Sequence, residues 1–407
     1  MASLNNYTKF LIKQNEQKKS NENRALVRML SLQPGSTKKS IAKSLGVSIK
    51  FVRKWSETTP NDINTDGRGW PKGKSRQVQQ PMREEILKIH SQLADDPDQY
   101  FTGATAVKQL FEQTFPDLSA PSLRTIGRIL KEAGRTHPGR YRQKGASAYL
   151  CYPEHLLYHD LGGRLLEADF IGHKFITGQT AAVNFIGFSF KQTPRLRYFA
   201  RIQSQTSRCF IEQTDKFFQK FEKPDFIKMD NALAMIGSAS GKRNLSESML
   251  FLLKNRVVPI FAVPRKPFTQ ASIEGNNSIF SRFFWNKTHF NNFEEIDLAL
   301  NRFNQSSLWY LNYKVIPIVK PDFSPKVIFI RQVSQETSKP GTILVLNELI
   351  QLDPVYSNYY VFVEWNLLSE QLSVFLQKEK QKHLIHQSAF LCNKNSLNKL
   401  NRGEPFI

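Results

Sequence analysis

The chain has 407 residues, of which 40% are hydrophobic, so it is long enough for two to four domains with cores of their own. Its formal net charge of +22 predicts a polyanionic partner, most simply nucleic acid, and residues 1–150 are the denser basic region, with 26 Lys and Arg against 13 Asp and Glu. Three widely separated cysteines exclude a disulfide framework and a cysteine-rich zinc site, and no apolar run is long enough to span a membrane. We therefore expect no membrane contact and a cytoplasmic location, nucleoid-associated in a prokaryote.

Residues 1–60 carry the pattern of a helix-turn-helix domain. Apolar residues recur at helical spacing in three short stretches, and Gly46 makes a tight turn before the last of them. Polar and basic residues of the last helix would then face DNA. These predicted contacts are Ser48, Lys50, Arg53 and Lys54. The alternative is a small helical bundle whose basic face is only solvated.

A linker is predicted over residues 61–80, which are rich in Gly, Pro and polar residues. Within it, Arg68, Lys72 and Lys74 resemble a basic arm that enters the minor groove of DNA. A plain flexible tether is the alternative interpretation.

A second helical module is predicted over residues 81–135, where three amphipathic stretches again suggest a helix-turn-helix. Arg124 and Arg128 would be exposed on its last helix and would contact DNA. Residues 136–159 predict a second basic linker that could follow DNA phosphates.

Residues 160–310 predict a mixed α/β core. Three strands joined by short turns should form an antiparallel meander, and two later strands that alternate with helices should add in parallel. The sequence therefore predicts a mixed five-stranded sheet flanked by helices. The strand signals are 165–171, 181–190, 196–204, 225–229 and 257–263.

The C-terminal part changes character. Residues 325–378 contain short strands separated by turns, which predict a small β-barrel, and residues 379–407 predict a polar, weakly ordered tail. The expected fold class is thus multidomain, with all-α N-terminal modules, an α/β core and a C-terminal barrel.

Three acidic residues of the core stand in matching contexts. Asp169 lies in an apolar strand, Asp230 ends a second apolar run, and Glu274 lies where a loop enters a helix. Carboxylates at buried strand ends are costly unless they are paired, hydrogen-bonded or bound to metal. Three converging carboxylates would hold two hard divalent cations, the arrangement used for displacement at phosphorus.

Each of these residues also has a purely structural interpretation. Asp169 could pair with Lys174, Asp230 and Asn231 could form an Asx turn, and Glu274 could simply favour a helix N-terminus. Glu167 shares a strand face with Asp169 and could support the site, but we do not predict it as a metal ligand.

The spacing of these residues resembles the catalytic core of the retroviral-integrase superfamily, the DDE transposases and integrases with an RNase H-like fold. The resemblance covers about residues 160–310, and the wider layout resembles bacterial insertion-sequence and Mu-like transposases. Ala232 departs from it, because the family usually has Gly after Asp-Asn. The motifs are Asp169; Asp230 with Asn231; and Pro264, Pro267, Gln270, Ile273, Glu274 and Asn277.

The resemblance implies a catalytic triad of Asp169, Asp230 and Glu274 that holds two Mg²⁺ ions, with Mn²⁺ as a substitute. It implies cleavage at the ends of a DNA element and transfer of those ends into target DNA by an oligomer on double-stranded DNA. It leaves open whether an ATPase partner assists, as in some Mu-like systems. Predicted DNA contacts near the triad are Arg265, Lys266, Asn277 and Arg282.

Two other functions stay open at this point. One is a non-enzymatic DNA-binding regulator or target-selection protein with a decayed core. The other is a metal-dependent hydrolase acting on RNA, against which the helix-turn-helix modules argue, because such helices read the major groove of B-form DNA.

Overall fold

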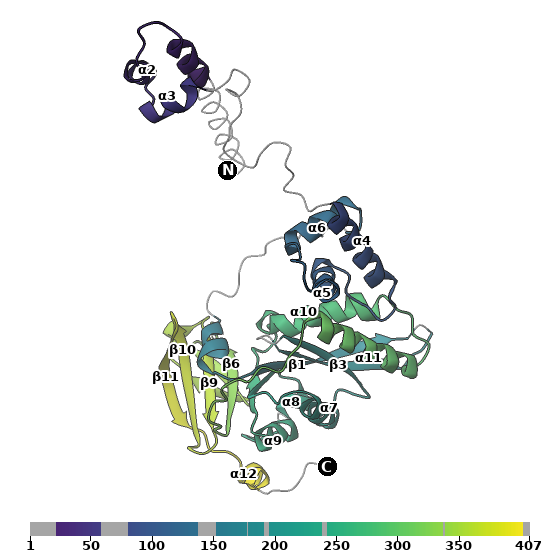
Figure 1. Cartoon of the computed structure of the whole chain (residues 1–407). Coiled ribbons are helices and arrows are strands. Elements are labelled where there is room, and N and C mark those ends of the chain that lie inside the picture. Colours follow the sequence, from purple (N-terminus) through teal and green to yellow (C-terminus); the bar gives the residue numbers. More distant parts are fainter. Residues whose placement is uncertain are drawn as a thin grey trace. The chain divides into compact units, whose positions relative to one another are not determined.

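The computed structural model describes residues 22–57, 80–136, 152–176, 178–190, 195–237, 242–336 and 338–401. Contacts divide the chain into two compact units, Met1–Gln80 and Pro81–Ile407 (Figure 1). The predicted linker 61–80 lies outside the described residues except for Gln80, and so do its basic residues Arg68, Lys72 and Lys74. Most of the predicted linker 136–159 also lies outside them.

The first unit contains the three helices that the sequence predicts. Residues 22–31 form the first helix, followed by α2 (Lys38–Leu45) and α3 (Ile49–Ser56). Gly46 ends α2 in the left-handed conformation with a φ of 63°, which lets the chain turn directly into α3. The small core consists of Val27, Ile41, Ala42, Val52 and Trp55.

The second unit begins with the predicted helical module, which comprises α4 (Gln80–Asp95), α5 (Ala104–Thr114) and α6 (Leu123–Glu132). The connection between α4 and α5 packs against α11 (Phe293–Tyr310). There the Tyr100 ring meets Phe303 edge-on at 5.0 Å, and Phe101 stacks on Tyr310 at 4.5 Å. The module is therefore attached to the α/β core by aromatic contacts.

The rest of this unit is built around one large mixed sheet with the strand order β11-β10-β9-β6-β5-β4-β1-β2-β3. As predicted, β1, β2 and β3 pair antiparallel, and β4 and β5 add in parallel next to β1. The five predicted core strands are β1 (Leu165–Phe175), β2 (Ala182–Phe190), β3 (Leu196–Ile202), β4 (Phe226–Met229) and β5 (Val258–Phe261).

Helices cover both faces of these strands (Figure 1). One layer consists of α7 (Ser207–Lys220), the short α8 (Leu233–Ile236) and α9 (Glu247–Lys254). The other consists of α10 (Ala271–Phe280), the π-helical turn η4 (Ser281–Trp285) and α11. Residues of β2 face both layers: Phe188 stacks on Phe217 of α7, whereas Phe185 meets Phe280 of α10.

The C-terminal strands correct the prediction of a separate barrel beside a five-stranded sheet. β6 pairs in parallel with β5, and β9, β10 and β11 follow antiparallel, so these strands extend the core sheet to nine. The sequence pattern predicted these strands except β11, which lies in the predicted tail, but strand partners depend on contacts that local alternation does not contain. The strands are β6 (Lys326–Gln332), β9 (Tyr360–Asn366), β10 (Gln371–Lys378) and β11 (Gln381–Ala389), with a separate hairpin of β7 (Thr342–Val345) and β8 (Glu348–Gln351).

Two further predictions are wrong at their boundaries. The predicted tail 379–407 contains β11 and α12 (Lys394–Asn401), where the Ser396 hydroxyl accepts a hydrogen bond from Leu245 N at 3.1 Å. The predicted linker 136–159 ends in buried structure, because Tyr152 and Leu156 belong to a core cluster beneath the sheet. Short turns of helix complete the fold at η2 (Leu156–Asp160), η3 (Pro267–Gln270) and η5 (Pro354–Tyr356).

Within the described ranges, no helix has the length and apolar character that a membrane crossing requires.

Candidate active site

The three predicted carboxylates line one cavity of about 490 Å³. Asp169 lies on β1, Asp230 directly follows β4, and Glu274 is in the first turn of α10. Because β1 and β4 are parallel neighbours, residues at their carboxyl ends meet at the same edge of the sheet, where open α/β sheets commonly bind ligands. The fold therefore brings together residues that are up to 105 positions apart in the chain.

Asp169 is held in place by Asn277, whose side-chain amide donates a hydrogen bond of 2.9 Å to Asp169 Oδ2. Burial and the neighbouring charge of Asp230 raise the pKa of Asp169 to about 7, and this hydrogen bond opposes the shift. Gly187 lies opposite Asp169 on β2, and a Cβ atom there would come within 3.2 Å of Asn277 Oδ1. The glycine therefore leaves room for α10 to approach the strand.

Asp230 adopts the Asx turn that is the simplest structural explanation for it. Its Oδ1 accepts a hydrogen bond from Ala232 N at 2.9 Å, and Ala232 caps α8 with a φ of −60°. A glycine is thus not needed at this position, because the backbone of Ala232 is not left-handed. Burial raises the pKa of Asp230 although the turn opposes this shift, so the turn does not remove the cost of the carboxylate.

Glu274 reaches the cavity from the first turn of α10, and the preceding loop sets the start of that helix. Arg265 has a left-handed φ of 56°, and Pro267 opens the 3₁₀ turn that leads into the helix. Burial raises the pKa of Glu274, with a further contribution from the charge of Glu167. The cavity wall here also includes Arg265 and Lys266, so cations border the carboxylates.

Beneath the cavity, Glu167 and Lys228 form a fully buried ion pair that the sequence reading did not predict. Their Oε1 and Nζ atoms are 3.3 Å apart, and both side chains are 0% exposed. Glu167 lies two residues before Asp169, and Lys228 lies two residues before Asp230. A charged residue at the second position before each aspartate was the signal available in the sequence.

Arg331 supplies a second buried charge near Asp230, and it comes from the C-terminal strand β6. Its guanidinium donates to Asn231 Oδ1 at 3.0 Å and to Ala262 O at 3.1 Å, and Asn231 donates to the same carbonyl at 2.7 Å. Burial lowers the pKa of Arg331, and no carboxylate among the described residues forms an ion pair with it. The added strands therefore help to shape the cavity.

The predicted DNA contacts fall into separate places. In the first unit, Lys50, Arg53 and Lys54 are exposed on α3, while the Ser48 hydroxyl caps that helix by accepting from Phe51 N at 3.1 Å. In the second module, Arg124 and Arg128 are exposed on α6, and Arg128 also lies 3.8 Å from Glu132.

Near the cavity the predicted contacts differ in character. Arg265 is exposed, and so is Arg282, whose Nε donates to Ser278 O at 3.3 Å. Asn277 is instead engaged with Asp169, so its main contact is the carboxylate and not solvent. Lys174, the alternative partner of Asp169, donates to Ser281 Oγ at 3.5 Å.

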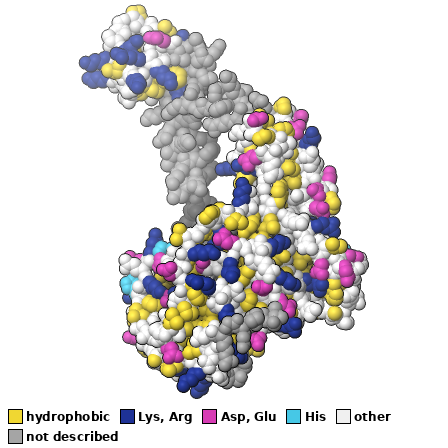
Figure 2. Space-filling model, turned by 60° about the horizontal axis from the view of Figure 1, so that its bottom comes forward, with side chains coloured by type: hydrophobic (Ala, Val, Ile, Leu, Met, Phe, Trp, Pro, Cys, Tyr) yellow, Lys and Arg dark blue, Asp and Glu magenta, His cyan; other side chains and the backbone are white. Residues whose placement is uncertain are grey.

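Basic side chains are unevenly distributed on the surface. Residues 22–57 contain eight Lys and Arg against two Glu, and several of the basic side chains are visible on the small unit in Figure 2. On the face of the second unit in the same view, Lys and Arg are interspersed with hydrophobic and acidic side chains. The first unit therefore presents the denser positive surface.

The carboxylates that line the cavity suit hard divalent cations, although they do not lie close enough together to form a metal site. Carboxylate oxygens are the ligands that Mg²⁺ and Mn²⁺ prefer, and the raised pKa of Asp169 marks a place where added positive charge would be stabilised. Over the described part of the chain, no three His, Cys, Asp or Glu side chains are arranged as a formed metal site.

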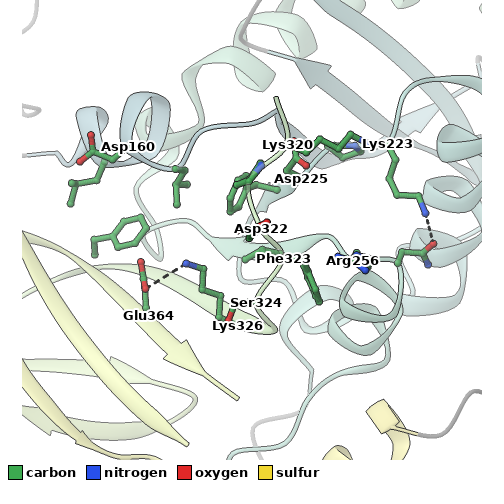
Figure 3. Close-up of a pocket in the computed structure, with 18 of the residues that line it drawn as sticks. Asp160, Lys223, Asp225, Arg256, Lys320, Asp322, Phe323, Ser324, Lys326 and Glu364 are labelled. Atoms are coloured by element: carbon green, nitrogen blue, oxygen red, sulfur yellow. Dashed lines mark hydrogen bonds and ion pairs between the residues drawn. The ribbon is translucent and has the colours of Figure 1, made fainter. Parts of the chain in front are cut away.

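A second cavity of about 460 Å³ lies at the opposite end of the parallel strands (Figure 3). It opens beside Phe226 and Val258, the first residues of β4 and β5. Among its charged residues, Glu364 pairs with Lys326 at 3.6 Å and also with Lys382. Among the described residues, the carboxylates whose pKa is raised by burial, Asp169, Asp230 and Glu274, all line the first cavity.

No protein-family model matches the sequence, and a search of curated proteins found no relative. Solved structures show weak similarity. A chain of the simian T-cell lymphotropic virus intasome, in complex with a PP2A regulatory subunit, matches 76% of this chain and 100% of its own length, at 11% identity and a TM-score of 0.32. A chain of the Mos1 strand transfer complex matches 72% of this chain and 92% of its own length, at 13% identity and a TM-score of 0.27. A chain of the mariner Mos1 paired-end complex with Mg matches 71% of this chain and 98% of its own length, at 11% identity and a TM-score of 0.17.

Proposed function

We propose that this protein is a transposase or integrase that cleaves DNA ends and joins them to target DNA in a metal-dependent reaction. The observation that carries the proposal is the convergence of Asp169, Asp230 and Glu274 on one cavity at the carboxyl edge of an α/β sheet. The motif resemblance to the DDE enzymes, with their RNase H-like core, supports the same function.

Two Mg²⁺ ions, or Mn²⁺ in their place, would supply an activated water or DNA 3′-hydroxyl and would stabilise the leaving oxygen. Asp169 and Asp230 would hold these ions from the sheet, and Glu274 would complete the site from α10. Asn277 would keep Asp169 in its orientation through the hydrogen bond of 2.9 Å. The carboxylates must be ionised for this role, and bound cations would lower the pKa that burial raises.

DNA would be held by basic residues outside the carboxylate cluster. Arg265 and Lys266 border the cavity and would contact the phosphates beside the reacting bond. The exposed residues Lys50 and Arg53 of α3 would contact DNA in the groove or along its backbone. Since joining two ends requires two sites, the active form would be an oligomer on double-stranded DNA. If the protein is of the Mu-like type, an ATPase partner would assist the reaction.

A DNA-binding regulator with an inactive core is the second candidate. It is favoured by one observation, that the carboxylates of the described residues are not arranged as a formed metal site. In that case the helix-turn-helix modules would carry the whole function.

A strand-transfer assay on labelled DNA from the ends of the element that carries the gene would separate the two. Wild-type protein should give joined products with Mg²⁺ or Mn²⁺, and Asp230→Asn should give none while binding the same DNA. The exposed Asp322 provides a matched control, because Asp322→Asn makes the same change at the second cavity. Tight end binding without products from the wild type would favour the regulator.

A further inference from the structure

The buried pair of Glu167 and Lys228 connects the strands of the carboxylate cavity to its helix. The two residues are direct partners in the parallel register of β1 and β4. Side chains two residues apart on a strand point to the same face, so Glu167 shares the face of Asp169 on β1, and Lys228 lies on β4 just before Asp230. Only Ala168 separates Glu167 from Asp169, and only Met229 separates Lys228 from Asp230.

Both partners also bind the segment that carries Glu274. Glu167 Oε2 accepts a hydrogen bond from Ile273 N at 3.0 Å, and Ile273 is the residue directly before Glu274. Lys228 Nζ donates to the carbonyl of Thr269, in the 3₁₀ turn before α10. The pair therefore contacts the backbone on both sides of the start of α10.

Two tyrosines complete this buried network. The Tyr158 hydroxyl lies 3.4 Å from Glu167 Oε1 and 3.4 Å from Lys228 Nζ, and the Tyr152 hydroxyl donates to Thr269 O at 3.4 Å. Each charged group thus has several partners, and this is the condition under which a buried ion pair can offset its desolvation.

Stability alone does not account for a pair of this kind. Replacing a buried ion pair with apolar residues of similar volume is often neutral or stabilising. What apolar residues cannot reproduce is the set of directed hydrogen bonds to Ile273 N and Thr269 O. These bonds fix the distance between the start of α10 and the two strands.

We infer that Glu167 and Lys228 are positioning residues, which hold α10 so that Glu274 faces Asp169 and Asp230 across the cavity. The inference deepens the proposed function and, in its part about metal, rests on it. Outer partners of metal ligands typically change metal affinity by about 10- to 100-fold when they are removed.

The test compares two double variants of the full chain. Glu167→Leu with Lys228→Met removes both charges and all their hydrogen bonds at similar volume. Glu167→Gln with Lys228→Met also removes both charges but keeps an oxygen that can accept from Ile273 N. Hydrogen exchange of the segment 267–280 reports on how firmly the pair holds the start of α10. Mn²⁺ affinity, measured by electron paramagnetic resonance, reports on the position of Glu274.

We expect the leucine variant to exchange its 267–280 amides faster and to bind Mn²⁺ at least about 10-fold more weakly, with the glutamine variant closer to wild type in both. Unchanged hydrogen exchange in the leucine variant would show that the pair does not hold the start of α10. Faster exchange with unchanged Mn²⁺ affinity would overturn the positioning role. If the leucine variant does not fold, the glutamine variant decides. If it loses as much Mn²⁺ affinity as Asp230→Asn does, the charges of the pair matter more than the hydrogen bond to Ile273 N. That result would contradict the inference.

The failure of the proposed function has its own signature. If Asp230→Asn leaves Mn²⁺ binding of the wild-type chain unchanged, the cavity is not the metal site. Hydrogen exchange then still decides whether Glu167 and Lys228 hold α10.

Discussion

Two pairs of charged residues lie close together along β1 and β4 and differ in their electrostatics. We call the pair of Glu167 and Lys228 the closed level, and the pair of Asp169 and Asp230 the open level. The first level joins opposite charges, is fully buried and is closed by hydrogen bonds. The second, two residues further along, places like charges beside a cavity, where the pKa of Asp169 rises to about 7. One level can be satisfied by the protein alone, whereas the other is satisfied only when a cation or protons are added. A self-contained ion pair and a pair of like charges thus lie about one strand repeat apart.

The largest expected effect on stability comes from removing one partner of the buried ion pair between Glu167 and Lys228. Lys228→Met leaves the Glu167 carboxylate buried without its counter-charge, and we expect this to lower the free energy of unfolding by about 3–5 kcal/mol. Urea unfolding of the full chain measures the change. The double variant with Glu167→Leu should recover most of it, and a single variant as stable as the wild type would mean that the pair is not buried as described.

The cavity that contains Asp169 and Asp230 should stabilise the protein when it binds divalent cations. Mg²⁺ at about 100 times its dissociation constant should raise the free energy of unfolding by about 2.7 kcal/mol, because ligands that bind only the folded state stabilise it by mass action. Thermal unfolding with Mg²⁺ and after chelation measures this difference. Asp230→Asn should lose most of the response, and an equal response in that variant would place the metal elsewhere.

The pH dependence of stability sharpens the comparison further. Asp169 has a folded pKa of about 7 against an unfolded value near 3.9, so the folded state holds its proton more tightly. Metal-free protein should therefore lose stability as pH rises from about 4 to about 7, and Asp169→Asn should remove that loss. We expect the variant to be about 1–3 kcal/mol more stable than the wild type at pH 8 and no more stable at pH 4. Equal slopes in the two proteins would contradict the raised pKa.

The smallest effect concerns the glycine that lets α10 approach β1. Gly187→Ala would place a Cβ 3.0 Å from Phe199 and 3.2 Å from Asn277, which must shift by a few tenths of an ångström. We expect a loss of about 1 kcal/mol in stability, because overpacking of this size forces small side-chain movements. Gly127→Ala is the control, since nothing lies within 4 Å of the added atom on α6, and it should be neutral or stabilising.

Much of the core could be predicted from local pattern. The five strands, their antiparallel and parallel pairs and the helices around them follow from alternation, turn signals and connection lengths. These features are encoded in neighbouring residues, so sequence alone could find them.

Other features required the tertiary structure. The strands β6, β9 and β10 look the same locally whether they close into a barrel or extend a sheet, and only the pairing of β6 with β5 decides. Asn277 looks like a residue that could contact DNA, but its amide binds Asp169, and Gly187 on the neighbouring strand β2 leaves room for this contact. Neither outcome can be deduced from spacing.

The sequence by itself determined the identity of the three acidic residues, the strands and helix that carry them, and the basic character of the helical N-terminal unit. Only the tertiary structure decided that the three carboxylates share one cavity, that Arg331 reaches Asn231 from a C-terminal strand, and that Glu167 pairs with Lys228. The physical reason is that strand propensity and turn chemistry act over a few residues, whereas the desolvation and pairing of charges depend on groups that folding brings together from 61 or more positions apart.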